Sequence, residues 1–173
     1  VNYNNEQDRF GQVARQWKMI EPNGEKWNSV LDEFIERDYF INPTMVIYEA
    51  SRNLSDSRNA VWHEEYTLPS MMDFYTPNLE DHGSYFFNWT THDEVAWKNF
   101  YDRWMAFLDD YKDRGGRVTV GSDAGFIYTL YGFSYIQEME LLQYAGFTPL
   151  QLIRASTLHT PNALFETTGQ PIR

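Results

Sequence analysis

The sequence predicts an α/β fold in which helices alternate with short parallel strands. Two apolar runs rich in β-forming residues, at 44–48 and 117–120, have the length of strands that are buried on both faces. A long helical pattern separates the two runs, and other helical patterns precede the first and follow the second. This order is typical of successive β/α units of a parallel sheet. Two strands cannot bury both faces of such a sheet, so we expect the 173 residues to be incomplete as a fold.

The first 48 residues predict two helices and the first strand. A short helix is expected over about 6–16, and a turn over 21–24 follows it. Asn42-Pro43 ends the next unit, and the strand at 44–48 comes after it. The second helix is amphipathic and is predicted from apolar residues at helical spacing: Trp27, Val30, Leu31, Phe34 and Ile35.

The middle of the chain contains a long segment without periodicity and then a long helix. Residues 49–90 are rich in aromatic side chains, so we expect an ordered excursion that packs on the rest of the molecule. Thr91 and Glu94 match a capping box, which predicts that a helix begins there and continues to about residue 114. Gly115-Gly116 predicts its left-handed C-cap, and the second strand follows at 117–120.

The last third of the chain begins with a glycine-rich loop and continues with helices. A helix is predicted over about 133–144, with Gly146 after its end. Thr148 and Gln151 form a second capping box around Pro149. The pair Thr160-Pro161 repeats the same pattern and predicts a separate, short final helix, followed by a loop from 167.

Charge and composition narrow the classes of partner. The chain has 14 basic and 25 acidic residues and a net charge of −11, so we expect neither nucleic acid nor a membrane surface as a partner. There are no cysteines, which excludes a disulfide framework and a thiolate metal site but leaves the compartment open. The polar start at Val1, without an initiator methionine, indicates a cut end rather than a signal peptide.

The stretch from 117 to 164 carries the most specific pattern. A strand ends in Gly121–Gly125 (Gly-Ser-Asp-Ala-Gly), and a Glu-Leu pair follows on the helix over 137–142. The sequences Ala-Gly-Phe-Thr-Pro at 145–149 and Arg-Ala-Ser-Thr at 154–157 come next, and Asn162-Ala163 closes the pattern. This order resembles the C-terminal part of the amidohydrolase superfamily, in the branch with imidazolonepropionase-like and prolidase-like enzymes. The resemblance covers about residues 25–166 and includes Asn42-Pro43-Thr44 before the first strand.

The resemblance implies an internal, C-terminal-half fragment of a (β/α)8 barrel, with about strands seven and eight, and an insertion at 49–90. It implies a metal-dependent hydrolase of carbon–nitrogen bonds, amide or cyclic amide, acting on a small molecule or a short peptide. Asp123 would bind one or two divalent ions, often zinc, and take the proton from the attacking water. A metal lowers the pKa of bound water to about 7, which a neighbouring carboxylate can exploit. The other ligands would lie outside this chain, which alone would be inactive, and assembly into an oligomer is left open.

Other interpretations stay open beside this one. Asp123 is also the residue type expected in a tight, glycine-rich turn. Tyr128, Tyr131 and Tyr135 follow the second strand and would line a substrate pocket or simply pack. His82 would reach the mouth of the site, but it, His63 and His92 more simply fit solvated loop histidines, and His159 fits a structural role. The whole chain could instead be a non-catalytic binding or scaffold protein that uses its aromatic excursion, or, on aromatic content alone, an unrelated sugar-binding α/β domain.

Overall fold

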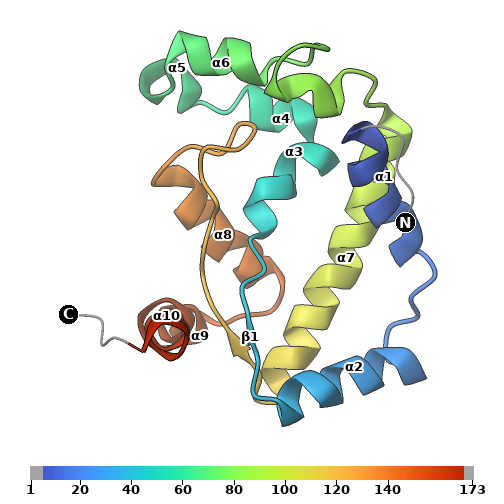
Figure 1. The fold of residues 1–173 in the computed structure, drawn as a ribbon, viewed down its shortest axis with the longest axis vertical. Coiled ribbons are helices and arrows are strands. Elements are labelled where there is room, and N and C mark those ends of the chain that lie inside the picture. The colour runs from blue at the N-terminus through green and yellow to red at the C-terminus, as the bar shows by residue number, and fades with distance from the viewer. Residues whose placement is uncertain (1–5, 170–173) are drawn as a thin grey trace.

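The computed structural model describes residues 6–169, and these residues are mostly helical (Figure 1). Helices account for 65% of the residues and strands for 2%. The expectation of an α/β fold that forms strands seven and eight of a (β/α)8 barrel is therefore wrong. Within the described residues, the elements in chain order are α1 (Glu6–Trp17), α2 (Glu25–Glu36), β1 (Phe40–Ile41), the 3-10 helix η1 (Met45–Tyr48), α3 (Glu49–Arg52), α4 (Leu54–Arg58), α5 (His63–Tyr66), α6 (Pro69–Tyr75), the 3-10 helix η2 (His82–Phe86), α7 (Thr91–Asp113), β2 (Arg117–Val118), α8 (Phe133–Tyr144), α9 (Pro149–Arg154), the π-helical turn η3 (Ala155–His159) and α10 (Thr160–Thr168).

The first predicted strand is the main error. Strand β1 lies earlier than expected, and the run at 45–48 forms a 3-10 helix instead. The backbone N–H of Val46 donates to the Glu138 carboxylate at 2.8 Å, so a side chain of α8 takes the place of a neighbouring strand. This contact joins residues 92 positions apart, which no local pattern in the run reveals.

The second strand forms as predicted but is shorter. Strands β1 and β2 pair in parallel, with Phe40 opposite Arg117 and Ile41 opposite Val118. Beyond the pair, Thr119 N still donates to Ile41 O at 2.9 Å, whereas Val120 N donates to the hydroxyl of Thr160 at 3.0 Å. The strand ends because the helical C-terminal segment supplies the next partner.

Helix α7 forms the spine of the molecule, and α1 and α2 lie against it at different heights (Figure 1). Its N-cap is Thr90, and Asp93 completes the capping box, one residue earlier than the predicted Thr91 and Glu94. Arg15 of α1 also binds Asp93, with an N–O distance of 2.7 Å. The main core around α7 contains Trp27, Leu31, Met45, Trp97, Phe100, Tyr101, Leu108, Tyr111, Val118, Leu141, Leu142 and Phe147.

Residues 49–90 form an ordered, helical excursion that covers one end of the molecule (Figure 1). Its side chains pack on the loop that follows β2 and form a second, smaller core of Ala50, Tyr75, Phe86, Ile127 and Tyr128. The tyrosine hydroxyls tie the two segments together: Tyr75 donates to Gly125 O at 3.0 Å, and Tyr128 donates to Tyr75 O at 3.1 Å. The excursion therefore positions the loop that contains Asp123.

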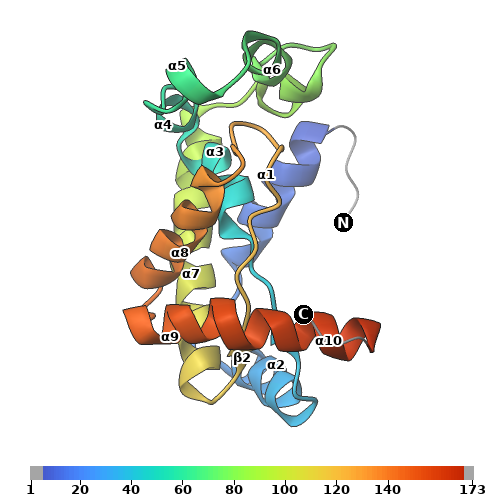
Figure 2. The same cartoon turned by 90° about the vertical axis from the view of Figure 1, so that its left-hand side faces the viewer.

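The C-terminal helices α9 and α10 run as one rod through the π-helical turn η3 (Figure 2). The separate helix that Thr160-Pro161 predicted does not begin there, because the backbone stays helical through His159 and Thr160. The Thr160 hydroxyl donates to Ala155 O at 2.9 Å while it accepts from the backbone N–H of Val120, two residues after β2. His159 Nδ1 lies 3.0 Å from Val118 O and donates to it, in agreement with the structural role expected of this histidine.

Over residues 6–169, none of the helices combines the length and the apolar character that crossing a lipid bilayer requires.

Candidate functional site

Asp123 lies on the loop that follows β2, five residues beyond its end at Val118, with its side chain exposed to solvent. Its φ of 45° places it in the left-handed region, which aspartate and asparagine tolerate better than most residues. The loop begins where the carboxyl ends of β1 and β2 meet, since a Cβ built on Gly121 would lie 2.8 Å from Asn42 Nδ2. No described residue hydrogen-bonds to the Asp123 carboxylate or forms an ion pair with it. The carboxylate is therefore available to a group from outside the described residues.

The described part of the chain does not complete a metal site around this carboxylate. It contains no group of three histidine, aspartate or glutamate side chains that would hold a metal ion. A divalent transition metal in a catalytic site typically needs three protein ligands. The donors present thus do not fit a metal on their own, and any metal bound by Asp123 would need ligands from elsewhere.

The histidines lie apart from Asp123 and have separate roles. His63 is buried, contrary to the expectation of a solvated loop histidine, with Nε2 3.0 Å from Ser57 O and Nδ1 2.7 Å from the Thr67 hydroxyl. In the neutral ring Nε2 donates to the carbonyl and Nδ1 accepts from the hydroxyl. His92 is exposed on the first turn of α7. The side chain of His82 lies outside the described residues.

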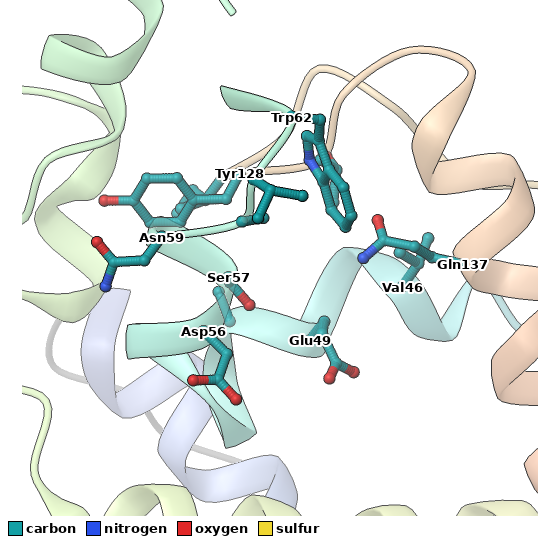
Figure 3. Close-up of a pocket in the computed structure, with 13 residues that line it drawn as sticks. Val46, Glu49, Asp56, Ser57, Asn59, Trp62, Tyr128 and Gln137 are labelled. Carbon is teal, nitrogen blue, oxygen red and sulfur yellow. The ribbon is translucent and has the colours of Figure 1, made fainter. Parts of the chain in front are cut away.

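A cavity of about 390 Å³, here called the loop cavity, opens between the excursion, η1, α8 and the loop after β2 (Figure 3). Its size falls within the range of small-molecule sites. Ile127 of its wall is four residues from Asp123, so their Cα atoms are at most about 14 Å apart. Side chains that line it include Val46, Glu49, Asp56, Ser57, Asn59, Trp62, Tyr128 and Gln137.

The walls of the loop cavity are held by aromatic contacts. The Trp62 indole stacks on the Phe133 ring of α8, with centroids 5.4 Å apart and planes 21° apart. Tyr128 packs edge-on against Tyr75 at 5.6 Å. Three tyrosines were expected either to line a pocket or to pack; Tyr128 lines the loop cavity, whereas Tyr131 and Tyr135 do not and are 69% and 37% exposed.

Two polar atoms of the cavity wall are buried without a partner among the described residues: Ser57 Oγ and Trp62 Nε1. Figure 3 shows Trp62 and Gln137 on one side of the cavity and Ser57 and Asp56 on the other. Leaving a buried donor unsatisfied costs about 1–3 kcal/mol, so such atoms are usually paired. Neither atom contacts solvent in this conformation, so a ligand with acceptor atoms would satisfy them only after the two side chains rotate toward the cavity.

Behind the cavity lies a carboxyl group that the sequence interpretation did not single out. Glu138 is fully buried, and burial raises its pKa to about 7 even though the Val46 N–H stabilises the charged form. Its second oxygen, Oε1, has no partner among the described residues. A pattern that could have identified it is the helical spacing of Ser134, Glu138 and Leu141, which share the buried face of α8.

Comparisons with known proteins give no relative for this arrangement: no family model, curated protein or solved structure matches the chain.

Proposed function

We propose that this chain contributes to a hydrolase that cleaves a carbon–nitrogen bond, amide or cyclic amide, in a small molecule or short peptide. The observation that carries the proposal is the Asp123 side chain: an exposed carboxylate, without a partner among the described residues, on the loop that follows the two parallel strands, five residues beyond the end of β2 at Val118. The resemblance of residues 117–164 to amidohydrolases supports the same assignment.

The proposed role of Asp123 is to take a proton from the water that attacks the substrate carbonyl. A general base needs access to water and to the reacting group, and the exposure of Asp123 supports the first of these requirements. The loop cavity, only a few residues further along the chain, would hold the remainder of the substrate. The described residues do not complete a metal site, so the role proposed for Asp123 is that of the general base alone.

The test is hydrolysis by the natural protein in its complete form, with dipeptides, N-acyl amino acids and cyclic amides as substrates and with Zn²⁺ or Mn²⁺ added. We expect Asp123→Asn to lower kcat about 100-fold or more, since a general base contributes about 10²–10⁴-fold. Asparagine keeps the left-handed backbone, so the fold should persist. The matched control is Asp102→Asn, on an exposed face of α7, which should leave kcat unchanged. Turnover that survives Asp123→Asn would refute the proposal.

A second candidate function is ligand binding without catalysis, in the loop cavity. It is favoured by the two buried donors without described partners, Ser57 Oγ and Trp62 Nε1. Compounds that raise the melting temperature and quench tryptophan fluorescence, with no turnover by the complete protein, would support it. Trp62→Phe keeps an aromatic ring against Phe133 but removes the pyrrole ring together with its N–H, so it should weaken such binding while Asp123→Asn leaves it unchanged.

A further inference from the structure

A second cavity, here called the apolar groove, lies on the other side of the main core, where α2 crosses α7 and the end of α1 approaches both. It encloses about 340 Å³. Tryptophan, phenylalanine and aliphatic side chains form nearly all of its wall; the side chains used below are Trp17, Trp27, Val30, Phe107 and Lys26. The groove is independent of Asp123 and of the loop cavity.

The wall of the apolar groove is already in place. Trp27 Nε1 donates to Asp110 Oδ2 at 2.9 Å, which fixes the indole plane. The Trp27 ring meets Phe107 edge-on with centroids 5.1 Å apart. Trp17 likewise packs edge-on against Phe100 at 5.2 Å. Binding of a ligand would therefore require little loss of side-chain conformational entropy in the wall of the groove.

A charged side chain lines the apolar groove. Lys26 is the only charged residue among the described residues that line it, and its side chain is exposed at the first turn of α2. Within residues 6–169 its ammonium group forms no ion pair. Glu21 and Glu25 line the adjoining cavity together with Lys26, but neither lines the groove itself, so the Lys26 ammonium group at its edge favours a ligand with one negative charge there.

We propose that the apolar groove binds a small amphipathic anion, with its aliphatic or aromatic body among Trp17, Trp27 and Phe107 and its carboxylate on Lys26. Apolar burial supplies most of the affinity, and the ammonium group selects the anion. A cationic amphiphile would meet Lys26 with repulsion, and a neutral one would gain nothing from it.

The test compares three probes with the same ten-carbon chain, decanoate, decanol and decyltrimethylammonium, by calorimetry and tryptophan fluorescence. We expect decanoate to bind about threefold more tightly than decanol, as an exposed ion pair allows, and the cationic probe to bind most weakly. Equal affinities for decanoate and the cationic probe would overturn the proposal.

Two variants locate the binding. Lys26→Gln should lower the affinity for decanoate about threefold and leave decanol unchanged, whereas the control Lys98→Gln, on the exposed face of α7, should change neither. Val30→Trp should fill the groove and abolish binding of every probe while circular dichroism stays unchanged. Decanoate binding that persists in Val30→Trp would overturn the proposal. Sedimentation that shows self-association of the wild type but not of Val30→Trp would also overturn it, because a second copy of the chain would then occupy the groove.

Discussion

The buried carboxyl group of Glu138 lies between α8 and η1, with one oxygen bound to a backbone N–H and the other without a described partner. Desolvation disfavours the charged form, so the folded protein holds this proton to about pH 7. In the unfolded chain the same carboxyl group is expected to lose its proton near the ordinary value of 4.5. Folding therefore couples to proton uptake between these two pH values.

The first prediction concerns the pH dependence of stability. A raised carboxyl pKa stabilises the fold below about pH 4.5, and this contribution is lost as the pH rises toward 7. Glu138→Gln cannot titrate, so its free energy of unfolding should gain about 3 kcal/mol over the wild type between pH 4.5 and 7.5. Urea unfolding across this range measures the difference. Glu140→Gln, exposed on the same helix, is the control and should follow the wild type; a constant offset between Glu138→Gln and wild type would contradict the prediction.

Single residues of the site were predictable only in part. The sequence indicated the loop position of Asp123 from the strand and glycines around it, and the residue does lie on the loop after β2, although the strand ends earlier than predicted, at Val118. It did not indicate Trp62 or Ser57 as neighbours of Tyr128, because that cavity forms only when the excursion folds onto the loop. Whether Asp123 is catalytic stays a prediction.

At the scale of elements, local capping chemistry predicted helices well. Helices α2, α7 and α8 and the capping box at Thr148 and Gln151 were all expected, because caps and apolar periodicity act within a few residues. The failures at 44–48 and at Thr160 share one cause. In both places a partner distant in sequence, Glu138 or β2, decides the hydrogen bonding of the backbone or of the side chain.

The second prediction concerns the start of α7. Asp93 completes the capping box of α7 by accepting a hydrogen bond from the backbone N–H of Thr90, and it also binds Arg15. Asp93→Ala should therefore lower the free energy of unfolding by about 1–2 kcal/mol. Burial alone would raise the Asp93 pKa, but hydrogen bonds from Thr90 and Arg15 outweigh it and the pKa is lowered. The stabilisation is thus present above about pH 4 and lost on further acidification.

Urea unfolding of Asp93→Ala at pH 7 and at pH 3 measures both parts of this prediction. His92→Ala, in the same turn and exposed, should cost less than about 0.5 kcal/mol. A loss for Asp93→Ala that is equally large at both pH values would show that the charge of Asp93 does not matter.

At the scale of the whole molecule, two cores of unequal size divide the packing. The main core surrounds α7, and the smaller one joins the excursion to the loop after β2. The sequence predicted that residues 49–90 would be ordered and would pack on something, from their aromatic content. The sequence could not predict that the molecule is mostly helical. The length of a strand depends on which distant segments pair with it, and the local sequence does not show that the pairing here stops after two residues.

The third prediction tests the division into two cores. Tyr75→Phe removes the hydroxyl that donates to Gly125 O and should cost about 1 kcal/mol, with faster amide exchange limited to 49–90 and 121–130. Leu108→Ala, in the main core, should cost about 2–5 kcal/mol and speed exchange throughout. Hydrogen exchange followed by mass spectrometry distinguishes the two patterns. Exchange that rises uniformly in Tyr75→Phe would show a single cooperative unit.

The π-helical turn at Ala155–His159 has a consequence for the exposed hydrogen-bonding groups at the edge of the strand pair. An unpaired strand margin is a template on which other extended peptides can grow. Here His159 and Thr160 occupy the carbonyl of Val118 and the amide of Val120, so side chains from a helix terminate the ladder on that flank. These two groups are therefore not offered to another extended peptide on that flank.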